Sequence, residues 1–404
     1  MDKLLMIADD LTGALDAGVA FASAGIQTCV GQGDYFLRNQ EARQYSVQVT
    51  VAETRHVSAQ DAYDQVYELV QRAAGCGFTC IYKKTDSALR GNPGAELAAV
   101  RDASEEKTIC FVPAFPKMNR VTRQGVQYID GTIPVAESVF GNDPFNPVRY
   151  SAVLEIISQT TEGRAYLADP SENVYDSGIA VFDAQTEADI LRIARNLVKS
   201  GNARLLAGCA GLASVLPQVL QFPTDERNTH YPGGHLAVFC GSINPISMAQ
   251  CQTAVDQGAP RFHLMEDGRF LPTEELAERI AHALQTASIT VFDTGSLEVQ
   301  GTDPKHIAER VSLVVKGVTE RNTGSILFII GGDTLIAFIR TMGIETIIPM
   351  AELFPGVVLA KYHDHGNWHF LISKSGGFGD EKLLMDIYGK LNPKEEMREV
   401  RKGR

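Results

Sequence analysis

The segment Ile81-Tyr-Lys-Lys-Thr-Asp-Ser-Ala-Leu-Arg-Gly-Asn92 decides the fold class. An apolar run typical of a β-strand ends in two lysines, two hydroxyls, a carboxylate and an arginine. A Gly-Asn-Pro-Gly turn then opens a helix. In α/β folds, ligands bind at the carboxyl ends of the strands. The segment therefore predicts a site for a small, polar, anionic molecule.

Strand and helix patterns alternate on both sides of this segment, which indicates a largely parallel sheet with helices on its faces. Apolar runs predict strands at 4–8, 27–30, 47–52, 79–82, 108–113, 179–182 and 205–207. Helical periodicity predicts helices at 12–24, 62–74, 95–103 and 187–198. Between 119 and 176 the pattern gives way to Gly, Pro, Asn and Asp, so we expect long loops there.

A second α/β series follows a polar segment rich in turn-forming residues. Strands are predicted at 236–239, 261–264, 289–292 and 326–330, helices at 273–284, 305–319 and 381–388, and two ribbons at 357–362 and 368–373. We therefore expect an α/β protein of two α/β domains with largely parallel sheets and an inter-domain cleft. The predicted division is an acid-binding domain at 1–222, a linker at 223–234, a nucleotide-binding domain at 235–392 and a charged tail at 393–404.

Composition excludes several classes of protein. The chain has 404 residues and a formal net charge of -12, which disfavours a nucleic-acid surface because such surfaces are basic. No signal peptide and no apolar run of membrane-spanning length is present, so we expect a cytoplasmic protein without membrane contact. The seven cysteines are odd in number and scattered, which favours reduced core thiols over disulfides or a zinc site.

The first chemical motif is Ile7-Ala-Asp-Asp-Leu-Thr-Gly13. Asp9 and Asp10 end a predicted strand, and Thr12 and Gly13 open a helix whose free N–H groups can face a ligand. These carboxylates are suited to fixing substrate hydroxyls or to holding Mg²⁺ through water. The alternative is that Asp10 or Thr12 only caps the helix.

The second motif is the opening segment itself. Lys83, Lys84 and Arg90 are suited to pairing with a carboxylate or phosphate, and Asp86 to orienting or deprotonating a hydroxyl. The alternative is a solvated charged turn. Arg55 follows another strand and would lie at the same sheet edge, although an isolated arginine there is more often an ordinary surface residue.

The second half of the chain carries three glycine turns, at 240–244, 331–334 and 375–379, each after an apolar strand. Such turns let phosphate approach the backbone at a helix N-terminus. Together they favour a nucleotide site over ordinary turns. The P-loop and G-x-G-x-x-G fingerprints are both absent from the sequence. His363-Asp-His365 is interpreted as a turn with exposed histidines, not as a metal site.

With these motifs in place, the chain resembles the four-carbon acid sugar kinase family over nearly its whole length. The resemblance rests on IADDLTGA, KKTDSALRGN, GGDT and SGGFG. The second of these motifs is closest to the D-threonate kinase branch. The resemblance implies transfer of the γ-phosphoryl group of ATP to the 4-hydroxyl of a four-carbon sugar acid, most simply D-threonate.

The resemblance also implies a set of site residues. For the substrate it implies Asp9, with Asp10 as a further candidate, Arg55, Lys83, Lys84, Thr85 and Asp86, and we add Ser87 and Arg90 of the same segment. The nucleotide set comprises Cys240, Gly241, Ser242, Gly331, Gly332, Asp333, Thr334, Gly376 and Gly377. Relatives often have Ser-Gly-Ser where this chain has Cys-Gly-Ser at 240–242, and a thiol is a poor donor, so a contact from side chain 240 is in doubt.

The expected mechanism needs alignment and charge neutralisation more than covalent chemistry. We hypothesise that Arg55 and Lys84 hold the carboxylate and that Asp9 and Asp86 hold hydroxyls. Asp9, Asp10 or Asp86 then acts as the catalytic base. Mg²⁺ would be bound mainly through ATP, with no dedicated protein metal site.

Several alternatives stay open at this stage. The acid could be D-erythronate, a 3-oxo-tetronate or 4-hydroxythreonine. The protein could instead be a sensor that binds sugar acid and nucleotide without catalysis, or a nucleotidyl transferase or synthetase that releases pyrophosphate. A homodimer is expected only because homodimers are common among enzymes.

Overall fold

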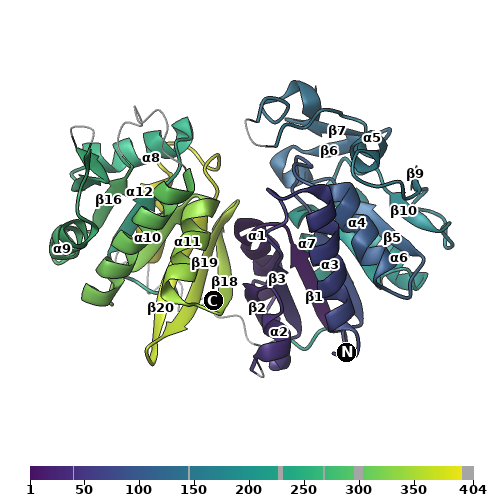
Figure 1. Cartoon of the computed structure of the whole chain (residues 1–404), viewed down its shortest axis with the longest axis horizontal. Coiled ribbons are helices and arrows are strands. Elements are labelled where there is room, and N and C mark those ends of the chain that lie inside the picture. Colours follow the sequence, from purple (N-terminus) through teal and green to yellow (C-terminus); the bar gives the residue numbers. More distant parts are fainter. Residues whose placement is uncertain (40, 144–145, 226–230, 267–268, 295–303, 394–404) are drawn as a thin grey trace. The chain divides into compact units, whose positions relative to one another are not determined.

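The computed structural model describes residues 1–39, 41–143, 146–225, 231–266, 269–294 and 304–393. It divides the chain into two compact units, Met1–Arg227 and Asn228–Arg404 (Figure 1). Each unit is built on its own series of parallel strands. The expected α/β class is confirmed.

The first unit contains eight parallel strands in the order β2-β3-β1-β4-β11-β5-β10-β9. These are β1 (Leu4–Ala8), β2 (Thr28–Gln32), β3 (Val47–Val51), β4 (Cys80–Lys84), β5 (Thr108–Val112), β9 (Ala165–Leu167), β10 (Gly178–Val181) and β11 (Leu205–Gly208). Strands β1, β3 and β5 are almost completely buried because helices cover both faces, which explains their continuous apolar sequences.

The helices of the first unit are α1 (Leu11–Ala22), α2 (Tyr35–Arg38), α3 (Ala59–Ala73), α4 (Pro93–Asp102), α5 (Val153–Ser158), α6 (Glu187–Lys199) and α7 (Ala210–Val215). The connections β1–α1–β2 and β3–α3–β4 cross the sheet in opposite directions. Right-handed crossovers therefore place α1 and α3 on opposite faces. Helix α1 packs beside α7, and α3 beside α4 (Figure 1). These two crossovers start from the neighbouring strands β1 and β3, and an α/β sheet forms its ligand crevice at such a point.

The region expected to be loops is more ordered than the sequence suggests. It contains a three-stranded antiparallel sheet of β6 (Val121–Arg123), β7 (Val126–Ile129) and β8 (Ile133–Pro134), followed by α5 and by β9 of the main sheet. These elements are two to six residues long, too short to show a clear periodicity. The expectation of loops throughout 119–176 was therefore wrong.

The second unit has the strand order β13-β16-β12-β17-β20-β19-β18, in which the first five strands are parallel to one another and the β20–β19 and β19–β18 pairs are antiparallel. The strands are β12 (Leu236–Cys240), β13 (Arg261–His263), β16 (Ile289–Asp293), β17 (Ile326–Ile330), β18 (Thr346–Phe354), β19 (Val357–Asp364) and β20 (Asn367–Lys374), with a separate pair of β14 (Met265–Glu266) and β15 (Arg269–Phe270). The helices are α8 (Pro245–Asp256), α9 (Thr273–Ala283), α10 (Pro304–Arg321), α11 (Gly332–Met342) and α12 (Leu383–Leu391).

The cysteines and the histidines of the 363–365 segment lie as the sequence predicted. All seven cysteines are free thiols, and all except Cys76 are buried, as expected of core residues. His363 and His365 lie at the β19–β20 hairpin and are exposed, which agrees with the turn interpretation. No helix among the described residues is both long enough and apolar enough to cross a bilayer.

Candidate functional site

The register of the first unit brings the acidic and basic motifs of the sequence together. Ala8 is paired with Val51 of β3 on one side and with Lys84 of β4 on the other. Asp9 therefore leaves the sheet beside Lys84, and Arg55 follows the neighbouring strand after a short turn. The segment 9–13, Arg55 and the segment 83–90 thus form one cluster at the carboxyl edge of the sheet.

Arg55 is the centre of this cluster. Its guanidinium donates from Nε and Nη2 to Oδ2 of Asp9 at 2.8 and 2.6 Å, and from Nη1 to Oδ2 of Asp10 at 2.5 Å. Asp86 Oδ1 lies 3.7 Å away. These three carboxylates raise the pKa of Arg55 against the opposing effect of burial. Arg55 is thus a charged residue that holds Asp9 and Asp10 in place.

Asp10 also caps helix α1. Its Oδ1 accepts a hydrogen bond from the Gly13 N–H at 2.8 Å, and its Oδ2 accepts one from the Thr12 hydroxyl at 2.9 Å. Burial acts to raise the pKa of Asp10, but Arg55, Lys84 and the Gly13 amide outweigh it and lower the pKa. The capping role that the sequence left open for Asp10 is therefore real.

Asp86 organises the turn that follows β4. Its carboxylate accepts hydrogen bonds from Nε and Nη2 of Arg90, at 3.1 and 3.0 Å, and from the Ala88 N–H at 3.0 Å. Burial acts to raise the pKa of Asp86, but Arg90 and Arg55 hold it well below its usual range. Leu89, in the same turn, has a φ of 62°, a conformation that is costly for a leucine.

The two adjacent lysines of β4 have different partners. Lys83 is fully buried, lies 3.1 Å from Oε2 of Glu96 on α4, and donates to the Lys84 carbonyl. Lys84 donates to the Thr85 carbonyl at 2.9 Å and, among the described residues, has no carboxylate within ion-pair distance. Lys83 is therefore paired inside the fold, whereas Lys84 has charge available for a ligand.

Two buried oxygens at this edge have no hydrogen-bond partner among the described residues. They are Oδ1 of Asp9 and the hydroxyl oxygen of Thr85, whose residues are 2% and 1% exposed. Buried polar atoms are almost always paired, so such orphans mark a place where a ligand or water completes the structure. Asp9 follows Ala8, the partner of Lys84 in the β1–β4 register, and Thr85 follows Lys84 in the chain.

Gly13 leaves room for the side chains of Asp10 and Lys84 at this edge. A β-carbon at this position would lie 2.5 Å from Oδ1 of Asp10 and 2.8 Å from Nζ of Lys84. Any other residue would therefore displace the cap or the lysine. The close approach of α1 to β4 keeps Lys84 at the start of the helix.

Sequence reasoning missed Arg120, which precedes β6. Its Nη1 donates to the Ser87 hydroxyl, and its guanidinium lies 5.0 Å from the Phe140 ring, whose centroid is 5.2 Å from Arg90. Gln127 adds a bond to the Ser87 carbonyl at 3.0 Å. The three-stranded sheet is thereby fastened to the turn after β4. Among the described residues, Arg120 has no carboxylate within ion-pair distance.

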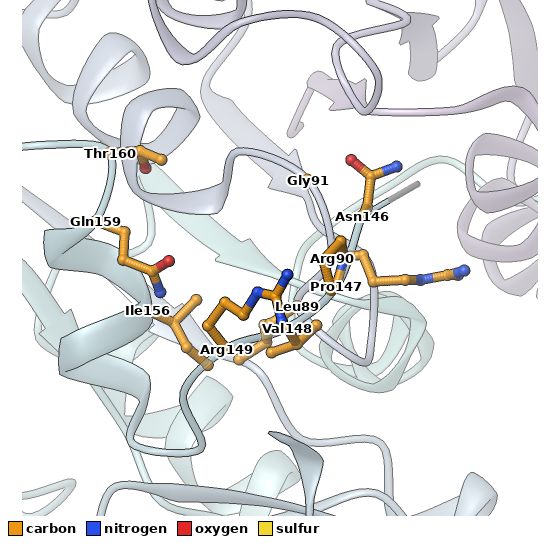
Figure 2. Close-up of a pocket in the computed structure, with 10 residues that line it drawn as sticks. All are labelled: Leu89, Arg90, Gly91, Asn146, Pro147, Val148, Arg149, Ile156, Gln159 and Thr160. Atoms are coloured by element: carbon orange, nitrogen blue, oxygen red, sulfur yellow. The ribbon is translucent and has the colours of Figure 1, made fainter. Parts of the chain in front are cut away.

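A cavity of about 210 Å³ borders residues 89–91 of the same turn. Figure 2 shows Gln159 and Thr160 on one side of it, Arg90 and Asn146 on the other, and Arg149 between them. The cavity shares Arg90 with the cluster, but Asp9 and Lys84 do not line it. We therefore place the candidate acid site at the orphaned oxygens and not in this cavity.

In the second unit, the three glycine turns converge at the carboxyl edge of the parallel strands. A β-carbon on Gly241 would clash with the Thr334 hydroxyl, and one on Gly376 with the Ser242 hydroxyl. Gly331, with a φ of 115°, donates its N–H to the Lys374 carbonyl at 3.0 Å and opens α11. The structure thus brings the predicted segments 240–242, 331–334 and 376–377 together.

Cys240 contributes its backbone to this edge, while its side chain lies in the core. The thiol is fully buried and 3.4 Å from the Ser242 carbonyl. A hydrogen bond with the Cys251 thiol lowers the pKa of Cys240. This buried position agrees with the earlier doubt that side chain 240 contacts a ligand.

No group of three or more His, Cys, Asp or Glu side chains in the described part of the chain is placed to hold a metal ion. The available features are a cationic, hydroxyl-rich edge in the first unit and glycine turns in the second. The first suits a hydroxylated carboxylate, and the second suits a phosphate chain.

Two family models match successive parts of the chain. Residues 4–216 match the family model of a sugar-binding N-terminal domain, and residues 237–384 match that of a nucleotide-binding C-terminal domain. The chain is 27% identical to D-threonate kinase of Salmonella typhimurium, covering 95% of this chain and 97% of that protein. It is 29% identical to D-threonate kinase of Bordetella bronchiseptica, covering 94% and 95%.

A more distant relative and a solved structure extend the comparison. D-erythronate kinase of Heliobacterium modesticaldum is 24% identical, covering 90% of each chain. A Salmonella typhimurium crystal structure described as a tRNA synthase has a TM-score of 0.79 at 23% identity, covering 96% of this chain and 99% of that chain. This structural likeness supports the fold alone.

Proposed function

This chain belongs to the four-carbon acid sugar kinase family and is a sugar acid kinase; from that premise we propose that it transfers the γ-phosphoryl group of ATP to the 4-hydroxyl of D-threonate. The observation that carries the proposal is the pair of orphaned buried oxygens, on Asp9 and Thr85, at the edge of the sheet where Lys84 ends β4. A hydroxylated carboxylate would supply hydroxyl donors for these two oxygens and a negative charge for Lys84, which has no ion-pair partner among the described residues.

We assign the substrate carboxylate to Lys84, with Arg120 as a neighbouring cation. Both lie close enough to Cys209 to lower the pKa of its thiol, although burial raises it overall to about 11. The expected contacts of Arg55 and Lys83 with the acid stay predictions. In the structure, Arg55 already holds two aspartates and Lys83 is paired with Glu96.

We assign the role of catalytic base to Asp9. Its Oδ2 is fixed by Arg55, and its Oδ1 is free to accept the proton of the attacking hydroxyl. Asp10 is occupied by the α1 cap, and Asp86 by Arg90. Asp86 then serves to hold the turn that presents Ser87 and Arg90.

In the second unit, the turns at 240–242, 331–334 and 376–377 would bind ATP through backbone N–H groups. Mg²⁺ bound with the nucleotide would neutralise phosphate charge. Because phosphoryl transfer is mostly alignment, the residues that fix the acid and the triphosphate supply most of the catalytic effect.

The test is an ADP-release assay over D- and L-threonate, D- and L-erythronate, a 3-oxo-tetronate and 4-hydroxythreonine, with the product located by phosphorus NMR. The expected result is a preference for D-threonate and a phosphate on its 4-oxygen. Preference for another acid would replace the substrate. Binding of acid and nucleotide without turnover would favour a sensor, and release of pyrophosphate would refute phosphoryl transfer.

A further inference from the structure

A buried lysine at the end of β20 holds the last of the three glycine turns. Lys374 is 1% exposed, and its Nζ lies 3.1 Å from the Ser247 hydroxyl and 3.1 Å from each of the carbonyl oxygens of Ser375, Gly376 and Phe378. An ammonium has three N–H groups, so these four acceptors use all of them. Lys374 itself therefore has no donor left for a ligand.

Two buried side chains of α8 hold the same turn. The Ser247 hydroxyl donates to the Gly376 carbonyl at 2.5 Å. Gln250 Nε2 donates to the carbonyls of Phe378 and Asp380 at 2.9 and 2.8 Å. Ser247 and Gln250 are both fully buried. The carbonyls of the turn are thus tied down by β20 and α8 together.

The N–H groups of the turn, unlike its carbonyls, have no hydrogen-bond partner among the described residues. No partner within the described part of the chain accepts a hydrogen bond from the N–H groups of residues 376–379. Consecutive free N–H groups in a glycine turn form a concave anion site. Fixing the carbonyls restricts the rotation of these peptide units, and so determines where their N–H groups can point.

We propose that Lys374 is a positioning residue for nucleotide binding: by holding the carbonyls of the 375–378 turn, with Ser247 and Gln250, it presents the amides of that turn to a phosphate of ATP. The choice of ATP as the ligand rests on the proposed function. The inference assigns to Lys374 an indirect role, since its own donors face the protein.

The test compares Lys374→Met with wild type by calorimetric titration of an ATP analogue with an imido β,γ-bridge. We expect the dissociation constant to rise about 10- to 100-fold, because an ammonium that organises several hydrogen bonds is lost. D-threonate affinity should be unchanged. In turnover, the KM for ATP should rise while kcat at saturating ATP stays close to that of wild type.

The matched control is Lys390→Met, which removes another lysine of the same unit that donates to a backbone carbonyl, that of Leu353. It should bind the analogue as wild type does. The inference is overturned if Lys374→Met binds within about twofold of wild type, or if Lys390→Met loses as much affinity as Lys374→Met.

A milder variant covers the case in which Lys374→Met fails to fold. Ser247→Ala removes one bond to Gly376 and one acceptor of Lys374, and should weaken the analogue about threefold to tenfold; unchanged affinity would overturn the inference. A wild-type protein that binds the analogue but phosphorylates none of the acids would refute the proposed substrate and leave this comparison of dissociation constants valid.

Discussion

Arg55 donates two hydrogen bonds to one oxygen of Asp9, at 2.8 and 2.6 Å, and leaves the other oxygen without a partner among the described residues. The two oxygens of one carboxylate therefore have different roles. Oδ2 anchors the group to the fold, and Oδ1 is available to a substrate. This asymmetry is our reason for choosing Asp9 among the three candidate bases.

Asp9→Asn should reduce turnover about 100- to 10,000-fold, because the amide keeps the shape of the carboxylate but cannot accept a proton. Affinity for the ATP analogue should stay unchanged. The measurement is steady-state ADP release with a parallel titration, and Asp61→Asn on the exposed start of α3 is the control. Turnover close to that of wild type would remove Asp9 from the role of base.

The two adjacent lysines should give opposite results on replacement by methionine. Lys84→Met should raise the KM for the acid about 10- to 100-fold with little loss of stability, because a charge-assisted contact to the ligand is lost. Lys83→Met should lower the free energy of unfolding by about 3 kcal/mol or more, because Glu96 is left buried without its partner.

Chemical denaturation and steady-state kinetics on the same two proteins separate these effects. If Lys83→Met weakened the acid and kept full stability, the assignment of the two lysines would have to be exchanged.

Arg120→Gln should raise the KM for the acid about tenfold, because a cation beside Ser87 is removed. Arg123→Gln is the matched control: it lies on β6 of the same small sheet and packs at 4.5 Å on Tyr128. If both changes had the same effect, the small sheet would matter for packing and not for recognition.

The lowered pKa of Asp86 predicts a dependence of stability on pH. A carboxyl group whose pKa is lower in the folded than in the unfolded state stabilises the fold above its unfolded pKa of about 4. This contribution is lost as the pH falls from there toward the folded pKa. The free energy of unfolding should therefore decrease in acid, and it should decrease less in Asp86→Asn. Equal slopes for the two proteins would contradict the shift.

Lys374 predicts a different dependence on the alkaline side. Burial lowers its pKa to about 8, against a smaller opposing effect of the thiols of Cys240 and Cys251. Above this pH the neutral amine has two N–H groups and a lone pair that faces carbonyl oxygens. ATP analogue affinity should therefore fall as the pH rises from 7 to 9, whereas it should stay level in Lys374→Met. A fall of the same size in the variant would assign the effect to another group.

Much of the candidate site could be predicted because parallel strands end at one edge. Asp9 follows β1 and Lys84 ends β4, so the sequence places both at one edge of a parallel sheet. That β1 and β4 are neighbours is known only from the structure. The glycine turns of the second unit were predictable for the same reason. Each follows a strand of the same parallel group.

The partners of the charged groups could not be predicted in this way. Lys83 and Lys84 point to opposite faces of β4, and only the lysine on the face covered by α4 can meet Glu96. The sequence does not show which face that is. Arg120 lies in a segment of short strands without clear periodicity, so its contact with Ser87 appears only in three dimensions. Lys374 did carry a signal, a charge at the end of an apolar strand, which the sequence reasoning passed over.

The fastening of the small β6–β8 sheet to the turn after β4 has a consequence for divergence within the family. In our proposal the strand ends supply groups that any hydroxylated acid can use, while Arg120 comes from the segment that leads into the small sheet, outside the main sheet. We expect that exchanging this segment between relatives changes the preference for one acid over another and leaves the phosphorylation chemistry intact. Grafting residues 119–143 between family members is therefore a practical route to kinases for other acids.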